Sequence, residues 1–305
     1  ICSSVVIAFP DKPIRIIVPF SPGGGTDLVA RTISEGMSRE LGQSVVVENR
    51  PGAGTTIGTD FVVKSPADGY TLLLATFAQA VNPSLIKNLP YNASRDLIPV
   101  AMVGNSPNVL VVPSQSPFQS VADVIAYAQK FPGKLTYASQ GNGTSAHLAG
   151  ELFISLTKVD MVHIPYKGAS QAITDVLGGQ VQMTFATASA AANLVRGGKL
   201  KALAVTTKER SASWPNTPTM IEAGVKDYGM ESWYGVCAPV GTPREIVMKL
   251  NAAVSAATKT RFFTSKLEEE GLMARAASPE SFGQYIKQEE LRWEKIIQAA
   301  KIRLD

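Results

Sequence analysis

The chain has 305 residues, of which 45% are hydrophobic and 18% are charged. This length exceeds what one hydrophobic core usually organises, so two lobes are expected, and the composition excludes a disordered protein. The net charge of +4 is small, and the 29 basic residues are interspersed with 25 acidic ones, which argues against a nucleic-acid partner.

The segment up to about Ala8 is apolar and small, and it turns abruptly into Phe9-Pro10-Asp11. This pattern is typical of the end of a signal peptide, so we expect residues 1–9 to be a leader and the protein to be exported. No other apolar run reaches the roughly eighteen residues that span a bilayer. Cys2 falls in this leader and only Cys237 remains, so no internal disulfide or thiolate metal site is expected. A lipid anchor on Cys2 stays open as an alternative.

Short β-branched runs alternate with amphipathic segments along the chain, which is typical of an α/β protein with parallel sheets. Apolar residues at four-residue spacing, such as Val29, Ile33 and Met37, indicate one face of a helix after the first strand. The first half is expected to contain strands at 14–20, 44–48 and 70–75, a helix at 26–41, and a second helix that follows the glycines of 50–54.

A comparable half follows Asn108 and is expected to form the second lobe as a continuous insert. Its strands are predicted at 109–112, 134–138, 162–164, 181–185 and 202–206, and its helices at 121–131, 145–157 and 169–177. The sequence thus predicts one lobe from residues 10–105 plus 235–305 and another from residues 106–234. Two chain crossings between them would make a hinge.

The chain then returns to the first lobe through a strand-like segment at 232–239. Thr242-Pro243-Arg244-Glu245 has the pattern of a capping box with proline at the first helical position, so a helix is expected from there through Val254. Ser278-Pro279 should open the last helix, whose apolar stripe includes Phe282 and Trp293. These aromatic side chains are expected to pack on the first lobe rather than contact a ligand.

Glycines lie between a strand and a helix at Pro22-Gly23-Gly24-Gly25, where backbone can approach a ligand and free N–H groups point outward. Such a helix start binds anions. The simpler interpretation is a tight turn with Asp27 as a cap or first-turn acid. A similar stretch, Gly141-Asn142-Gly143-Thr144, precedes the 145–157 helix, so one loop in each lobe suggests opposed jaws. The residues at 76–79 and 187–189 occupy comparable strand ends, where open α/β sheets bind ligands.

An enzyme is the alternative class, because Gly141 to Ala146 match the dinucleotide pattern G-x-G-x-x-A. That match is weak, since the next strand ends in Pro165-Tyr166-Lys167 without the acid that would bind a ribose. Phosphate-loop, nucleophile-elbow and zinc-protease motifs are absent from the sequence. With only His147 and His163, neither a metal site nor a catalytic triad is expected.

Two further groups could reach an anion. His147 either donates to a carboxylate or caps and packs, whereas His163 is expected to be structural. Tyr166 and Lys167 end a strand at the same rim, and Lys167 offers a point charge that could otherwise be solvated.

Several segments together resemble the Bug-type extracytoplasmic receptors, the solute-binding components of tripartite tricarboxylate transporters. The resemblance covers essentially the whole mature chain in order. The matching segments are Pro10 to Arg15, Val18 to Asp27 with Ala30-Arg31, Val47 to Gly54, Ala67 to Leu72, Gly143 to His147, Pro165 to Gly168, Trp233-Tyr234-Gly235 and Gly241-Thr242-Pro243.

The resemblance implies a type II periplasmic-binding-protein fold, in which two α/β lobes close over a carboxylate held by backbone amides, hydroxyls and waters. It implies a non-catalytic, monomeric receptor without cofactor or metal, which delivers a small organic carboxylate to the membrane subunits of its transporter. A receptor that signals to a membrane partner is the alternative. Asp27 is interpreted as structural and paired with Arg31, because a carboxylate facing an anion is repulsive. The implied ligand-binding residues are Phe20, Ser21, Gly24, Gly25, Thr76, Gln79, Ser145, His147, Tyr166, Lys167, Thr187 and Ser189.

Overall fold

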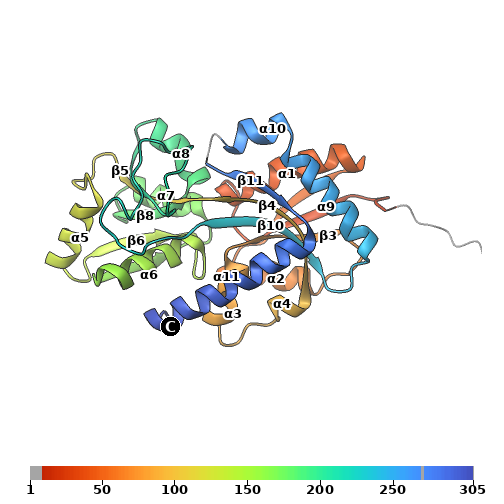
Figure 1. The fold of residues 1–305 in the computed structure, drawn as a ribbon, viewed down its shortest axis with the longest axis horizontal. Helices are drawn as coiled ribbons and strands as arrows, with labels where there is room; N and C mark the ends of the chain where they lie inside the picture. Colours follow the sequence, from red (N-terminus) through yellow and green to blue (C-terminus); the bar gives the residue numbers. More distant parts are fainter. Residues whose placement is uncertain (1–8, 269–270, 305) are drawn as a thin grey trace, which may run out of the picture.

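A computed structural model describes residues 9–268 and 271–304 and contains two β-sheets, each flanked by helices (Figure 1). We call the six-stranded sheet with its helices lobe 1 and the five-stranded sheet with its helices lobe 2. The strand order in lobe 1 is β11-β4-β10-β3-β1-β2, and in lobe 2 it is β7-β6-β8-β5-β9. The described chain is therefore an α/β protein of two lobes.

Lobe 1 has a mixed sheet in which β1 pairs in parallel with β2 and β3, while β10 runs antiparallel to β3 and β4. Its strands are β1 (Ile14–Val18), β2 (Val45–Asn49), β3 (Thr71–Thr76), β4 (Leu97–Ser106), β10 (Ser232–Pro239) and β11 (Met273–Ala277). Its helices are α1 (Gly25–Leu41), η1 (Ala53–Thr55), α2 (Thr56–Val63), α3 (Ala78–Leu85), α4 (Ala93–Asp96), α9 (Arg244–Thr258), α10 (Arg261–Phe263), η2 (Thr264–Glu268) and α11 (Pro279–Ala300).

Lobe 2 is built in a similar way, with β6 parallel to β7 and β8 and with β5 antiparallel to β8 and β9. Its strands are β5 (Asn108–Pro113), β6 (Leu135–Ser139), β7 (Met161–Pro165), β8 (Met183–Thr187) and β9 (Leu200–Val205). Its helices are α5 (Val121–Lys130), α6 (Ser145–Thr157), α7 (Ala169–Leu177) and α8 (Ala188–Arg196). The carboxyl ends of β6, β7 and β8 lead into the N-termini of α6, α7 and α8.

The two lobes are joined by crossings that lie side by side. Pro107 alone separates β4 from β5, and residues 206–231 connect β9 to β10. Ser232 pairs with Ser106 on the lobe 1 side. On the lobe 2 side, the Asn108 N–H donates to the hydroxyl of Thr206 at 2.8 Å. The crossings therefore support each other through hydrogen bonds.

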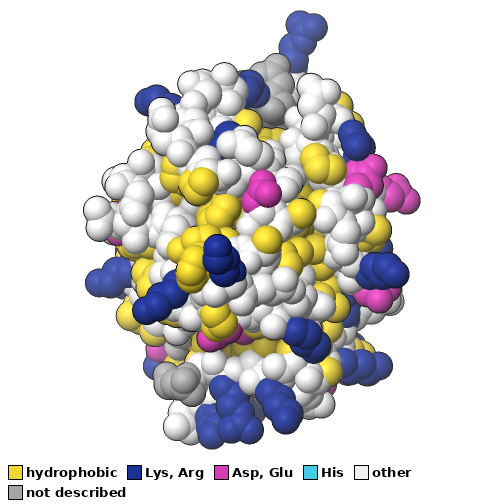
Figure 2. Space-filling view, turned by 90° about the vertical axis from the view of Figure 1, so that its left-hand side faces the viewer, with side chains coloured by type: hydrophobic (Ala, Val, Ile, Leu, Met, Phe, Trp, Pro, Cys, Tyr) yellow, Lys and Arg dark blue, Asp and Glu magenta, His cyan; other side chains and the backbone are white. Residues whose placement is uncertain are grey.

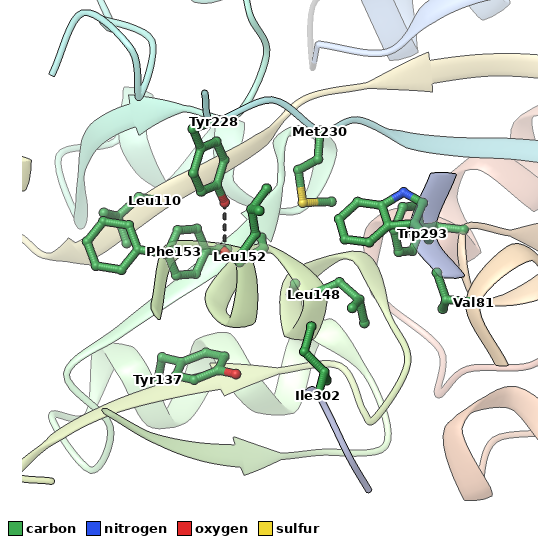
Figure 3. Close-up of a cluster of buried hydrophobic side chains, with 14 of the residues drawn as sticks. Val81, Leu110, Tyr137, Leu148, Leu152, Phe153, Tyr228, Met230, Trp293 and Ile302 are labelled. Atoms are coloured by element: carbon green, nitrogen blue, oxygen red, sulfur yellow. Dashed lines mark hydrogen bonds between the residues drawn. The ribbon is translucent and has the colours of Figure 1, made fainter. Parts of the chain in front are cut away.

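An apolar cluster runs from lobe 1 into lobe 2 along α11 (Figure 3). Trp293 of α11 packs its ring edge-on against Phe77, with centroids 4.9 Å apart. Ile302, beyond the end of this helix, is buried beside Leu148 of α6. The hydroxyl of Tyr228 donates to the Ala149 carbonyl of α6 at 2.8 Å. The last helix thus packs on lobe 1, as predicted, and also contacts lobe 2.

Figure 2 shows the end of the molecule formed by lobe 2. Basic side chains are dispersed over this face, with apolar atoms and a few acidic side chains between them. Nucleic-acid binding uses a continuous basic stripe, and no such stripe crosses the face in view.

The local predictions near the C-terminus had mixed outcomes. The capping box at Thr242 to Glu245 is wrong: Pro243 is itself the N-cap, and the Thr242 hydroxyl donates to the Pro239 carbonyl instead. The last helix does begin as predicted, because Ser278 accepts from the Ser281 N–H. The edge strand β11 was not predicted, since its residues Met-Ala-Arg-Ala-Ala carry no strand-like alternation. The alanine-rich α8 was also missed.

Candidate ligand-binding site

The glycine loop between β1 and α1 is held in place by Asp27. Its carboxylate accepts hydrogen bonds from the Gly23 N–H at 3.1 Å, from Arg31 Nε at 2.9 Å and from Asn49 Nδ2 at 2.9 Å. Gly23 has φ of +84°, a conformation that favours glycine. Asp27 is therefore structural and paired with Arg31, as the sequence predicted, and it fixes the shape of the loop.

The charge state of Asp27 follows from its surroundings. Burial alone would raise the pKa of this carboxyl, but hydrogen bonds from Arg31, Asn49 and the Gly23 backbone outweigh burial and lower the pKa. The carboxylate is consequently ionised at neutral pH and fully engaged within lobe 1.

The start of α1 meets the helix starts of lobe 2 in a closed seam. A Cβ placed on Gly25 would lie only 2.2 Å from Ser189 Oγ and 2.9 Å from Thr187 Oγ1. A Cβ on Gly24 would lie 3.3 Å from the Cβ of Ala169, the first residue of α7. The backbones of α1, α7 and α8 therefore converge, and glycine at these positions permits their close approach.

Hydrogen bonds cross the same seam. The Ser21 N–H donates to the Lys167 carbonyl at 3.2 Å, and the Ser170 hydroxyl donates to the Pro22 carbonyl at 3.3 Å. The two lobes are thus in direct contact on this side of the molecule.

Three buried hydroxyl groups at this seam lack a hydrogen-bond partner within the described residues. They are Thr187 Oγ1, Ser189 Oγ and Tyr234 OH, on side chains that are 3%, 7% and 1% exposed, respectively. Burial raises the pKa of Tyr234, and the nearby hydroxyls of residues that include Thr187 and Ser189 oppose this shift. The Tyr234 hydroxyl lies near the hydroxyls of Thr187, Ser189, Ser232 and Thr26 but forms no hydrogen bond of standard geometry with them. An unsatisfied buried hydroxyl costs free energy, so the cluster is suited to a polar ligand.

The glycine loop of lobe 2 is held differently, by a pair of stacked histidines. His147 Nδ1 accepts from the Gly143 N–H at 3.2 Å, and His163 Nε2 lies 2.7 Å from Ser139 Oγ. The two rings stack with centroids 4.2 Å apart. Burial lowers the pKa of His147 to about 3, with a further contribution from His163, and burial lowers the pKa of His163 to about 4. Both rings are therefore neutral at pH 7, and His147 caps the loop.

A family model described as "Tripartite tricarboxylate transporter family receptor" matches residues 29–302. The chain belongs to this receptor family. It is 38% identical to the protein BugT of Bordetella pertussis over 97% of the chain and 91% of that relative. The periplasmic binding protein BugD superposes with a TM-score of 0.93 at 34% identity, covering 97% of this chain and 99% of that one. The R. palustris protein Rpa4515 with adipate has the same TM-score at 38% identity, with the same coverage of both chains.

These findings make the chain a solute-binding receptor of the tripartite tricarboxylate transporter family. The predicted two-lobed periplasmic-binding-protein fold is confirmed. Family members work outside the cytoplasm as periplasmic binding proteins. The expected leader at residues 1–9 lies almost wholly outside the described residues. Among described helices, none is both long and apolar enough to cross a bilayer.

The receptor brings some of the predicted ligand-binding residues together at the seam. These are Ser21, Gly24, Gly25, Thr187 and Ser189. Phe20, which precedes Ser21, and Thr76 are both buried. Thr76 ends β3 directly opposite Tyr234. Within residues 9–268 and 271–304, no group of three or more His, Cys, Asp or Glu side chains could hold a metal ion.

Five other predicted residues lie elsewhere or have other partners. Gln79 Nε2 donates to the Ala93 carbonyl at 3.4 Å, and the Tyr166 hydroxyl donates to Asp175 Oδ2 at 2.5 Å. The Lys167 side chain is exposed to solvent. Ser145 Oγ accepts from Asn108 Nδ2 at 3.2 Å, and His147 caps its own loop.

Sequence reasoning did not single out Tyr234 or Asn108, two buried residues that each carry a polar atom without a partner in the described chain. Tyr234 belongs to a matching motif of the family, and its sequence context predicts only a strand. A signal existed, because a phenol hydroxyl in a strand that is buried throughout must find a polar partner. Asn108 is fully buried opposite Thr187, and its Oδ1 has no partner in the described chain.

Proposed function

We propose that the receptor binds a small carboxylate at the seam, between the N-termini of α1 and α8. The observation that carries this proposal is the cluster of buried, unpartnered hydroxyls of Thr187, Ser189 and Tyr234 beside Gly25. A carboxylate accepts hydrogen bonds from hydroxyl groups and from the free N–H groups at a helix start. It would satisfy all three hydroxyls at once without a buried cation.

The proposed contact set is a subset of the sequence prediction. It comprises Phe20, Ser21, Gly24, Gly25, Thr76, Thr187 and Ser189, with Tyr234 added. Ser145 and His147 act indirectly by shaping the lobe 2 loop. Gln79, Tyr166 and Lys167 are left out, because their polar groups have other partners or face solvent.

The same proposal states which residues move together as lobes and where the receptor delivers its ligand. Residues 10–105 with 235–305 move as one lobe and residues 106–234 as the other, except that Ser106 and residues 232–234 belong to strands of the lobe 1 sheet and move with it. Ligand binding stabilises the closed form. The monomeric receptor works in the periplasm, binds its ligand without chemical change, and delivers it to the membrane subunits of the transporter.

A thermal-shift screen tests ligand class. Adipate, malate, citrate, benzoate and glutamate each serve as a probe, and a binder at a hundredfold excess over its dissociation constant should stabilise the protein by about 2.7 kcal/mol. Mass spectrometry of the recovered acid should show it unchanged. Absence of any shift with all five acids, or conversion of a bound acid, would contradict the proposal.

Removal of one of the three unpartnered hydroxyls gives a sharper test, because it should raise the free energy of unfolding but lower the affinity for the ligand. Tyr234→Phe removes a buried group without a partner, so the ligand-free protein should gain about 1 kcal/mol in urea unfolding. Affinity for the best acid should fall about tenfold, since a ligand hydrogen bond is lost.

Tyr228→Phe is the matched control, because the Tyr228 hydroxyl is also buried but already donates to Ala149. This variant should lose stability by about 1 kcal/mol and keep its affinity. Equal behaviour of the two variants would count against a ligand at Tyr234.

A further inference from the structure

A groove of about 510 Å³ crosses the boundary between the lobes, at the outer edge where β2 and β7 lie. On the lobe 1 side, residues from η1, α2 and the end of α3 line the groove. On the lobe 2 side, the 141–142 and 165–167 loops line it, and one residue of the C-terminal segment completes the wall. The lining residues are Ala53, Gly54, Thr56, Ile86, Asn88, Gly141, Asn142, Pro165, Tyr166, Lys167 and Leu304. The wall of this groove is therefore shared between the parts that move.

The groove depends on closure of the lobes, because the backbone of lobe 1 and the backbone of lobe 2 come into close contact beside it. A Cβ on Gly54 would lie 2.6 Å from the Asn142 carbonyl oxygen. A Cβ on Gly143 would lie 2.2 Å from Asn82 Oδ1 in lobe 1. Rotation of the lobes about the two crossings would separate these contacts and divide the groove into halves.

The chemistry of the groove differs from that of the ligand site. Its walls are mainly apolar, and Lys167 is the charged side chain among the lining residues. Lys167 is exposed and forms no ion pair within the described chain. Thr56 Oγ1 is buried without a partner on the lobe 1 side. A matching occupant would bring an acidic group for Lys167 and an apolar side chain for the walls.

We propose that this groove is the docking surface for an acidic loop of the transporter's membrane subunit, which thereby recognises the closed receptor. The proposal rests on the proposed function. A transporter has to distinguish loaded from empty receptors, and a surface formed by both lobes changes when they close. A partner can favour one state only through differential contacts with it. The acidic loop would contact Lys167 from lobe 2 and the η1 segment from lobe 1 together.

The test uses a receptor locked in the closed form without any ligand. Gly24→Cys with Ala169→Cys should form a disulfide, because their Cβ atoms would lie 3.3 Å apart and a shift of a few tenths of an ångström brings them into the usual range of ~3.5–4.5 Å. Cys237 is buried and stays out of the reaction. The membrane subunits are placed in lipid nanodiscs, and binding of oxidised and reduced receptor is measured by biolayer interferometry at low salt.

The oxidised receptor should bind at least about tenfold more tightly than the reduced one, and Lys167→Glu should weaken its binding at least about tenfold. Lys134→Glu is the matched control: Lys134 is an exposed lobe 2 lysine that precedes β6, at the opposite end of the strand from the groove. It should change affinity less than about twofold.

Equal binding of the oxidised and reduced forms would overturn the proposal, as would equal binding of Lys167→Glu and its control. Dimerisation of the locked protein in light scattering, with loss of dimers in Lys167→Glu, would assign the groove to a second copy instead. Because the lock replaces the ligand, these outcomes are independent of the carboxylate screen. Failure here leaves the ligand proposal intact, and failure of the screen leaves this test valid.

Discussion

The two glycine-rich loops of the receptor, residues 21–25 in lobe 1 and 139–144 in lobe 2, are similar in sequence position but are held by opposite chemistry. The first loop is held by the ionised carboxylate of Asp27, which lies in the helix that follows the loop. A neutral imidazole, His147, caps the second. The first loop faces the orphan hydroxyls of lobe 2, whereas the second touches Asn82 and Gly54 of lobe 1. A shared strand-glycine-helix pattern therefore predicts proximity to the cleft but not the role of each loop.

The largest expected effect comes from blocking the first loop. Gly25→Val should abolish carboxylate binding, with a loss of at least about a thousandfold or 4.1 kcal/mol, because its Cβ would overlap Ser189 Oγ. Folding should survive, since Gly25 begins a helix with ordinary backbone angles. Calorimetric titration with the best acid measures the loss, after circular dichroism has confirmed the fold. Gly178→Ala, at the far end of α7, is the control, and normal binding by Gly25→Val would refute the seam as the site.

Acid should affect the second loop selectively. The pKa values of His147 and His163 are about 3 and about 4, below the ordinary value of 6.5. Between pH 6.5 and these lowered pKa values, the unfolded chain binds more protons than the folded chain. The stability that the neutral rings contribute is therefore complete above pH 6.5 and is lost as pH falls toward 4 and below. Two such groups should cost about 3 kcal/mol or more by pH 4.

Nearby ionisable groups modify this acid response. Burial raises the pKa of Glu151, which faces His147, and this shift opposes the histidine effect over part of the range. Urea unfolding at pH 7, 5.5 and 4 should therefore show a steeper decline in the parent than in His147→Gln with His163→Gln. Parallel curves would mean that the pair does not control the loop.

Removal of the Asp27 charge should have an intermediate effect. Asp27→Asn keeps the shape but weakens three hydrogen bonds to a buried carboxylate, so the free energy of unfolding should fall by about 2 kcal/mol. Glu35→Gln removes the partner of Arg39 in an exposed ion pair of the same helix and should cost less than about 0.5 kcal/mol. If both variants unfold at the same urea concentration, the loop does not depend on Asp27.

The smallest effect is expected at Lys167. Its ammonium is exposed and lies outside the proposed contact set, so Lys167→Ala should change carboxylate affinity by less than about 1 kcal/mol, and less still in high salt. Calorimetry at two salt concentrations measures this. A larger loss would return Lys167 to the ligand site and weaken its assignment to the groove.

Local patterns in the sequence predicted most of the regular structure. The helices 145–157 and 169–177 agree with α6 and α7 at both ends, and the i,i+4 spacing predicted the Asp27–Arg31 pair. Prediction failed where local signals were weak or ambiguous. The exposed β11 is placed by pairing with β4 rather than by its own residues, and α9 is capped by Pro243, one residue later than expected.

The details of the site depended on contacts between residues far apart in the chain. Gly25 and Ser189 meet only because the two lobes close, and no spacing along the chain encodes that distance. The same is true of Tyr234, whose hydroxyl reaches the α8 start from a different strand. Residue type did predict the chemistry of the jaws, since glycines and hydroxyls dominate both sides. It could not predict which polar groups, such as the Tyr166 hydroxyl, would find partners within their own lobe.

The single residue between β4 and β5 has a mechanical consequence. Pro107 restricts its own φ angle, and the strands on both sides are anchored in sheets. This crossing should therefore allow elastic bending but not free rotation of one lobe about the other. The second crossing runs alongside it, with Ser232 paired to Ser106, and together they leave one easy axis of bending. Little chain entropy then has to be lost when the lobes meet. More of the interaction energy of a bound acid remains available as affinity.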